Sequence, residues 1–190
     1  MIKGLHHNAY RCRDSEETRR FYEDFLGLPL AHTLKIEETM TGRKTGVGVL
    51  HTFYQLDDGS CLAFFEAPDM PFEFKDQHDF DLHIALEVEP EALDKMFAKG
   101  KAEGREVRGV SDHKFIRSIY FRDPNGYVIE LTAKVPGKES AMDPGKNHAR
   151  DMLKAWQANK AKPAGPPNVH AVGFRPAHVI AGNAPLGGAS

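Results

Sequence analysis

Apolar and polar residues alternate in short runs along the first part of the chain, in the pattern of half-buried β-strands. These runs cover residues 4–12, 30–38, 47–56 and 60–67, and a helical pattern fills residues 15–27 after the first of them. Asp14 and Ser15 are typical helix-start residues, and Gly27 is a typical helix end. The expected order of elements is therefore βαβββ.

The same order recurs after a connecting stretch. Strand patterns over residues 81–89, 105–110, 117–123 and 127–133 surround a helical pattern at 91–104. His7-x-Ala9 aligns with His83-x-Ala85, and a phenylalanine follows each histidine at the same interval, Phe21 and Phe97. We interpret both phenylalanines as helix core, and the recurrence as an internal repeat, which revises the expected fold as a whole.

The ends of the two repeats differ at one chemically important position. Tyr54-x-x-Asp57 aligns with Tyr120-x-x-Asp123, and Gly59 aligns with Gly126. Four residues after each glycine, the first repeat has Ala63 and the second has Glu130. The second repeat therefore carries a carboxylate where the first has none.

His7, His83 and Glu130 form the candidate metal site. Paired βαβββ units place inward side chains of corresponding strands around one cleft, so His7 and His83 are expected to face each other, with Glu130 reaching the same centre. Two neutral imidazoles and one carboxylate hold a divalent metal on one face and leave positions open for substrate. His6 and Glu66 are expected to point to the opposite face. Any single histidine is more often a core or surface residue than a metal ligand, but three such residues at repeat-matched positions favour the metal site, and a buried glutamate needs a partner.

Composition narrows the class of protein. The chain has 190 residues, 41% of them hydrophobic, and a formal net charge of -2, which fits one domain plus an extension. No basic patch predicts a nucleic-acid partner, and no apolar run predicts a membrane span or a signal peptide. Cys12 and Cys61 lie in strand-like runs, which favours buried free thiols over a disulfide and a cytoplasmic location.

The segments "HNAYRCRDSEETRRFYEDFLGLPL" and "SIYFRDPNGYVIEL" resemble the vicinal oxygen chelate superfamily, which includes glyoxalase I, extradiol ring-cleaving dioxygenases, fosfomycin-resistance proteins and methylmalonyl-CoA epimerase. The resemblance implies an α+β fold over residues 1–134, in which two paired βαβββ units (about 1–68 and 79–134) form a curved mixed sheet around a metal cleft. It also implies His7, His83 and Glu130 as the metal ligands. Ala63 stands where glyoxalase-type enzymes have a fourth ligand, which argues against a glyoxalase.

The stretch "DHKFIRSIYFRDPNGYVIE" resembles the extradiol dioxygenase signature through His113, Tyr120, the turn 123–126 and Glu130. Ser111 departs from that signature, and residues 64–66 lack a pocket histidine that two-domain members carry. The resemblance implies an Fe(II) dioxygenase that cleaves a catechol-like aromatic with O2, with His113 as proton shuttle and Tyr120 as hydrogen-bond donor to the substrate. A solvated loop histidine and a core aromatic are the alternative interpretations of these two residues.

Two other classes fit the same residues. The triad can hold Mn(II), Ni(II) or Zn(II) as a Lewis acid, as in a glyoxalase-like or fosfomycin-resistance-like isomerase, lyase or thiol transferase acting on a vicinal diol or hydroxycarbonyl. A metal-free small-molecule binding or resistance protein is the third class, and the intact triad disfavours it. Phe53, Phe64, Phe65 and Phe115 are candidates either for an apolar substrate pocket or for the core.

Residues 135–190 change in composition and are expected to form a C-terminal extension. Asp143 and Pro144 predict the start of a docking helix over about 144–160, with Met152, Leu153 and Trp156 on one stripe. The Ala-, Gly- and Pro-rich stretch 161–190 is expected to be an extended arm or partly disordered. Such an arm suits wrapping a second subunit, covering the cleft or hanging as a loose terminus, and we expect a homo-oligomer.

Overall fold

A computed structural model describes residues 1–38, 44–76 and 78–160 of the chain. The chain divides into two compact units, Met1–Asp143 and Pro144–Ser190. The first unit continues past Lys134, where the sequence pattern places the end of the domain. Within the described ranges, no helix is long and apolar enough to cross a membrane.

The predicted first βαβββ repeat is confirmed. In chain order it contains β1 (Tyr10–Cys12), α1 (Ser15–Arg19), which continues as the π-helical segment η1 (Arg20–Phe25), then β2 (Leu30–Glu38), β3 (Lys44–Gln55) and β4 (Cys61–Glu66). The sheet order is β1-β4-β3-β2, with β1 parallel to β4 and the other pairs antiparallel. The first strand is shorter than expected, and His7 joins the sheet only through an isolated bridge to Cys61.

The second repeat has the same topology. Its elements are β5 (His83–Glu87), α2 (Pro90–Ala102), β6 (Val107–Asp112), β7 (Ile116–Arg122) and β8 (Val128–Lys134). The sheet order is β5-β8-β7-β6, which repeats the first unit strand for strand. The described strands therefore form two four-stranded mixed sheets, which confirms the predicted α+β fold of two paired βαβββ units.

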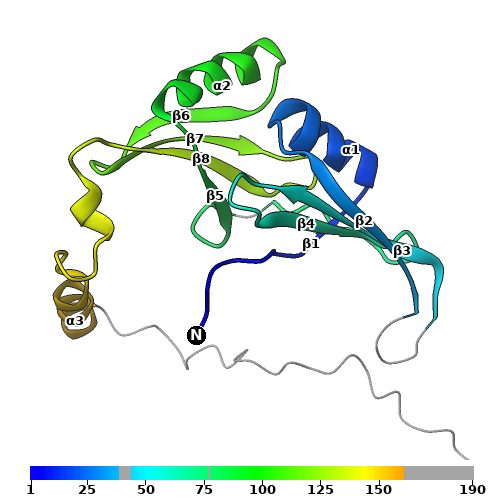
Figure 1. Cartoon of the computed structure of the whole chain (residues 1–190), viewed down its shortest axis with the longest axis horizontal. Helices are drawn as coiled ribbons and strands as arrows, with labels where there is room; N and C mark the ends of the chain where they lie inside the picture. Colours follow the sequence, from blue (N-terminus) through cyan, green and yellow to red (C-terminus); the bar gives the residue numbers. More distant parts are fainter. Residues whose placement is uncertain (39–43, 77, 161–190) are drawn as a thin grey trace, which may run out of the picture. The chain divides into compact units, whose positions relative to one another are not determined.

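The two helices α1 and α2 lie on one side of the sheets, so the opposite sheet faces are left for the functional groups (Figure 1). The core lies under the helices and includes Phe21, Tyr22 and Leu93, all at most 2% exposed. Phe97 is partly buried against this core, as predicted for the equivalent of Phe21. Cys12 and Cys61 are free thiols, also as predicted.

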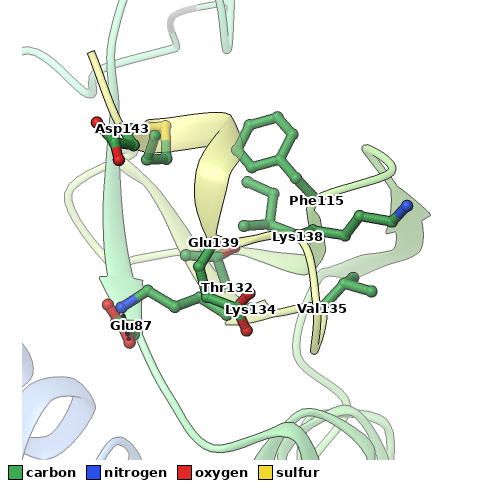
Figure 2. A pocket seen from close by; sticks show the side chains of 10 residues that line it. Glu87, Phe115, Thr132, Lys134, Val135, Lys138, Glu139 and Asp143 are labelled. Atoms are coloured by element: carbon green, nitrogen blue, oxygen red, sulfur yellow. Dashed lines mark ion pairs between the residues drawn. The ribbon is translucent and has the colours of Figure 1, made fainter. Parts of the chain in front are cut away.

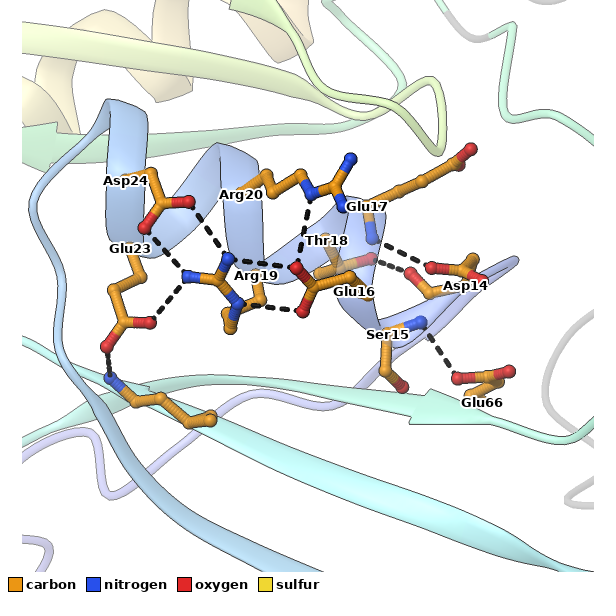
Figure 3. A network of polar contacts seen from close by, with 11 residues as sticks. Asp14, Ser15, Glu16, Glu17, Thr18, Arg19, Arg20, Glu23, Asp24 and Glu66 are labelled. Carbon is orange, nitrogen blue, oxygen red and sulfur yellow. Dashed lines mark hydrogen bonds and ion pairs between the residues drawn. The ribbon is translucent and has the colours of Figure 1, made fainter.

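Polar contacts at the start of α1 fix the helix to its sheet. The Asp14 Oδ1 atom accepts a hydrogen bond from the Glu17 backbone N–H at 2.8 Å, which confirms the predicted N-cap. The Glu66 Oε2 atom accepts from the Ser15 N–H at 2.8 Å (Figure 3). Glu66 therefore serves the helix N-terminus and, as predicted, points away from the candidate site.

Arg19 ties the exposed side of the same helix together. Its guanidinium pairs with Glu16, Glu23 and Asp24 at 2.7–2.9 Å (Figure 3). The hydrogen bonds that Glu16 accepts from Arg19 and then from Arg20 lower the pKa of Glu16 to about 2. Because the carboxylates are exposed, the network stabilises the helix only modestly.

The turn before β8 connects the two repeats. Both Asp123 oxygens accept hydrogen bonds, including one from the Tyr22 hydroxyl of η1 at 2.9 Å. The Asn125 side chain accepts from the Arg13 N–H at 2.9 Å and donates to the Thr18 hydroxyl at 3.2 Å. Asp123 and Asn125 are 2% and 1% exposed. The "DPNG" motif is thus a structural clamp between the repeats.

The C-terminal extension differs from the prediction. A 3-10 helix, η2 (Glu139–Met142), belongs to the first compact unit, and α3 covers Ala149–Asn159. The expected helix start at Asp143 and Pro144 is wrong, because Asp143 is extended and His148 occupies the N-cap position. The expected arm at 161–190 lies outside the described residues.

Candidate metal centre

His83 and Glu130 come together on the sheet face opposite α2. They lie on the parallel strands β5 and β8, where His83 is in register with Val128 and Ala85 with Glu130. The His83 Nε2 atom is 3.2 Å from the Glu130 Oε2 atom. Glu130 is only 5% exposed, and a carboxylate buried in its charged form requires a compensating cation.

The hydrogen bonding of His83 prepares it to bind a metal ion. Its Nδ1 atom lies 2.8 Å from the Asp79 carbonyl oxygen, which can only accept, so Nδ1 carries the hydrogen. A neutral ring then presents the Nε2 lone pair to the carboxylate, and two acceptors face each other at 3.2 Å. Such a pair needs a shared proton or metal ion, and an imidazole nitrogen with a carboxylate oxygen is a donor set that divalent transition metals favour.

Tyr120 and His113 extend this site. The Tyr120 hydroxyl donates to the Glu130 Oε1 atom at 3.3 Å, and the His113 Nε2 atom lies 3.0 Å from the same hydroxyl. Burial first, then the Glu130 charge, raises the pKa of the Tyr120 phenol, so it stays protonated as a donor. His113, Tyr120, Glu130 and His83 thus form one continuous chain of polar contacts.

His7 does not join this group. Among residues 1–38, 44–76 and 78–160, no three or more His, Cys, Asp or Glu side chains form a cluster that could hold a metal ion. His7 lies in the first repeat, with its ring centroid 5.4 Å from that of Phe53 and 6.0 Å from that of His51. The expected meeting of His7 with His83 inside one chain is absent from the described structure.

The strand registers explain where His7 stands. His7 bridges to Cys61, two residues before Ala63, just as His83 pairs with Val128, two residues before Glu130. His7 is therefore the repeat equivalent of His83, as the sequence predicted. His6 was expected on the opposite face, but its Nδ1 atom is 2.7 Å from that of His7, because both residues precede the regular strand β1.

The registers also correct the alignment of Tyr120. Tyr120 pairs with Glu130, whereas Ala63 pairs with Phe53, so Phe53 and not Tyr54 is the equivalent of Tyr120. Tyr54 is fully buried under the helix, with its ring 5.4 Å from that of Tyr22. The first repeat has one residue fewer between its aspartate and glycine, which hid this shift. Tyr120 therefore lies on the site face and is not a core aromatic.

The phenylalanine candidates separate into different environments. Phe64 is fully buried in the helix-side core. Phe53 and Phe65 lie on either side of the buried ring of His51, at centroid distances of 4.1 and 3.7 Å. Burial lowers the pKa of His51. The sequence analysis assigned His51 no role. Its position on β3, two residues before Phe53 and on the same face of the strand, is the signal in the sequence that points to it.

Arg108 supports the site from β6, and sequence reasoning missed it too. One guanidinium nitrogen donates to both Asp79 oxygens at 2.9 and 2.8 Å, and the guanidinium carbon lies 5.7 Å from the centre of the Tyr120 ring. Arg108 thereby holds the segment whose carbonyl fixes His83. Outer contacts of this kind tune the ligand beyond the atoms that touch the ion.

We expect Arg108→Met to weaken Mn(II) binding by about tenfold, because the Asp79 carbonyl loses its support. Titration calorimetry on the metal-free protein measures this effect. Arg20→Met is the matched control, because Arg20 is an exposed arginine of the first repeat. Equal affinities in the two variants would show that Arg108 does not position His83.

Comparisons with known proteins agree with this fold. The metallothiol transferase FosB of Shouchella clausii (strain KSM-K16) is 26% identical over 137 residues, which cover 69% of this chain and 80% of that protein. FosX from Listeria monocytogenes, a fosfomycin resistance protein solved with Mn(II) and sulfate, is 22% identical and aligns with a TM-score of 0.54 over 73% of this chain and 98% of its own.

A glyoxalase/dioxygenase from Nostoc punctiforme is 23% identical and aligns with a TM-score of 0.53 over 70% of this chain and 92% of its own. These solved structures share the paired βαβββ fold. The sequence profile of one family matches residues 4–131, which is more than half of the chain and includes every candidate site residue. The chain therefore belongs to the Glyoxalase/Bleomycin resistance protein/Dioxygenase superfamily.

Proposed function

We propose that this protein is an enzyme that uses a divalent metal ion as a Lewis acid on a small molecule with two adjacent oxygens. The observation that carries the proposal is the 3.2 Å approach of the Nε2 atom of His83, which is open to solvent, to the Oε2 atom of the buried Glu130. FosB is named a metallothiol transferase and FosX was solved with Mn(II), which supports Lewis-acid chemistry and Mn(II) before dioxygen chemistry and Fe(II).

We assign the metal ion, Tyr120 and His113 separate roles in the proposed reaction. His83 and Glu130 would hold the ion, which would supply Lewis-acid stabilisation of the negative charge that develops on a substrate oxygen. Tyr120 holds the outer oxygen of Glu130 and keeps the carboxylate turned toward the ion. His113, exposed at the end of the polar chain, exchanges a proton with solvent and passes it through the Tyr120 hydroxyl. Both roles require Tyr120 to stay protonated, as its raised pKa indicates.

The third ligand in this proposal is His7 of a second copy of the chain. His7 occupies the position of His83 on the equivalent sheet face of the first repeat, where Ala63 replaces the glutamate. That face carries a histidine without a carboxylate, and the face of the second repeat carries both. A twofold axis that brings unlike faces of two copies together would complete two identical sites.

A complementation experiment tests the shared site. His7→Ala and Glu130→Ala should each be inactive, and an equal mixture that is unfolded and refolded together should regain about a quarter of the wild-type sites. The rescue arises because each mixed dimer has one site with both changes and one intact site. Refolding either variant alone is the control, and the absence of rescue would contradict a site built from two copies.

A reaction panel tests the chemistry. Mn(II)-loaded protein is incubated anaerobically with the phosphonate epoxide fosfomycin, alone or with small thiols, and epoxide loss is followed by ³¹P NMR. We expect consumption that disappears in Glu130→Gln. Two further arms of the panel use α-hydroxycarbonyl compounds with Mn(II)-loaded protein and catechols with Fe(II)-loaded protein in the presence of oxygen. The Lewis-acid proposal would be overturned if neither epoxides nor α-hydroxycarbonyl compounds react while catechols cause oxygen uptake.

Extradiol ring cleavage is the second candidate, and one observation favours it. The signature residues His113, Tyr120 and Glu130 are joined by contacts of 3.0 and 3.3 Å, as a proton relay to a metal-bound catechol would require. In that case His113 carries the shuttle role. The oxygen-uptake arm of the panel distinguishes the two candidates.

A further inference from the structure

A pocket of about 480 Å³ continues the candidate site along the second sheet. Its floor is formed by the register pairs Glu87 with Thr132 and Ile116 with Lys134. Thr132 follows Glu130 by two residues on β8 and lies on the same face, so the pocket begins roughly 7 Å along the strand from Glu130. A volume of this size suits a small organic group.

The segment that follows β8 folds back to form the other wall. The Val135 N–H donates to the Phe115 carbonyl at 2.9 Å, and η2 contributes Met142. Figure 2 shows Phe115 and Val135 on one side of the pocket and Glu87 with the Lys134 ammonium on the other. This wall belongs to residues 135–143, beyond the part of the chain that the superfamily profile matches.

The charges at the pocket are largely occupied by protein partners. Lys134 pairs with Glu87 at 2.6 Å, and the Glu139 carboxylate accepts the Gly137 N–H at 2.9 Å. Thr132, Lys138 and Asp143 also line the pocket. The apolar groups there are the side chains of Phe115, Ile116 and Val135, together with the Met142 thioether. A ligand that matches them is apolar and uncharged at this end, because a new charge would compete with the existing pairs.

We infer that this pocket binds an uncharged alkyl or aryl group attached to the metal-chelating head of the substrate. The inference rests on the proposed function, because the head is placed by the ion at His83 and Glu130. A substrate with an apolar chain of several carbons then spans both sites, and the pocket selects against short analogues.

Hydroxamates of increasing length test the inference, because their two adjacent oxygens chelate divalent metals. Calorimetry on full-length, Mn(II)-loaded protein compares acetohydroxamate with hexanohydroxamate. We expect about three- to fourfold tighter binding per buried methylene, which over the four extra methylenes is on the order of 100-fold for the longer ligand. Equal affinities would overturn the pocket, while Mn(II)-dependent binding of both ligands would leave the proposed function intact.

Val135→Trp fills the pocket and should reduce the ratio of the two affinities to about threefold or less, with acetohydroxamate binding unchanged. Val47→Trp is the control, because Val47 is an exposed valine of β3. An unchanged ratio in Val135→Trp would overturn the inference, as would a second copy that fills the pocket.

A measurement without metal tests the pocket even if the proposed function is wrong. Hexanol is titrated into metal-free protein with labelled Ile, Val and Met methyl groups. Shifts concentrated at Ile116, Val135 and Met142 would support the pocket even if neither hydroxamate requires Mn(II). Shifts spread over the whole protein, or none, would count against it.

Discussion

If Glu130 is a metal ligand as proposed, we expect Glu130→Gln to abolish stoichiometric Mn(II) binding, with an affinity loss of at least about 100-fold. The substitution keeps the size of the side chain but removes the charge that offsets the metal ion, and it places an amide opposite the His83 Nε2 atom. A loss this large exceeds the effect of removing an outer contact, because a ligand itself is changed. Calorimetry or Mn(II) electron paramagnetic resonance measures it.

Glu66→Gln is the matched control for this prediction. Glu66 lies on β4, the last strand of the first repeat, as Glu130 lies on β8, the last strand of the second. The Glu66 carboxylate accepts a hydrogen bond from the Ser15 N–H at the start of α1 and does not face the site. Its substitution should lower stability slightly and leave Mn(II) affinity unchanged. If Glu130→Gln binds Mn(II) as well as the wild type, the metal centre lies elsewhere and the proposed function fails with it.

The architecture was predictable because the strands and helices of each repeat are indicated by local patterns in the sequence. Alternation of period two, the Asp14 cap and the repeated spacing from His to Phe were enough to place strands and helices and to identify the repeat. The same periodicity placed Glu130 on the site face and Glu66 on the other. The predicted ends of the helices and strands were less accurate. The last helix was expected to start at Asp143 and Pro144 but starts at Ala149, because a helix-cap residue followed by Pro does not by itself show where the first helical turn forms.

The spatial relation between the repeats was not predictable in the same way. Strand periodicity assigns a side chain to a face of its own sheet, but it says nothing of the distance between two sheets. His7 and His83 occupy equivalent positions in the two repeats, and for that reason we expected their side chains to lie close together in one cleft. The described chain keeps them on separate sheets, so the third ligand had to be sought in a second copy. Arg108 was missed because a lone arginine on a strand carries no periodic signal.

The buried clamp at Asp123 yields the largest expected effect on stability. Asp123→Ala should lower the free energy of unfolding by about 4 kcal/mol, because it leaves the Tyr22 hydroxyl and two backbone N–H groups buried without acceptors. Urea unfolding followed by circular dichroism and by the fluorescence of the buried tyrosines, such as Tyr22 and Tyr54, measures the loss. Tyr22→Phe, which removes one of these contacts without leaving a large cavity, should cost about 1–2 kcal/mol.

Asp58→Ala provides the comparison in the first repeat. Asp58 occupies the exposed turn before β4, and among the described residues its side chain accepts hydrogen bonds from Ser60, so its loss should cost less than about 1 kcal/mol. Equal effects at Asp58 and Asp123 would show that the turn itself matters and that the contact between repeats does not.

The stability difference between the wild type and Asp123→Ala should also depend on pH. Burial raises the pKa of the Asp123 carboxyl above its ordinary value of 3.8, although its hydrogen bonds oppose the change. A group whose pKa is raised on folding binds its proton more tightly in the folded state, and the resulting stabilisation is complete below the unfolded pKa. The difference should therefore be largest below about pH 3.8 and should decrease as the pH rises through the folded-state pKa. A difference that grows with pH would mean that the ionised carboxylate, and not the acid, is the form that this clamp stabilises.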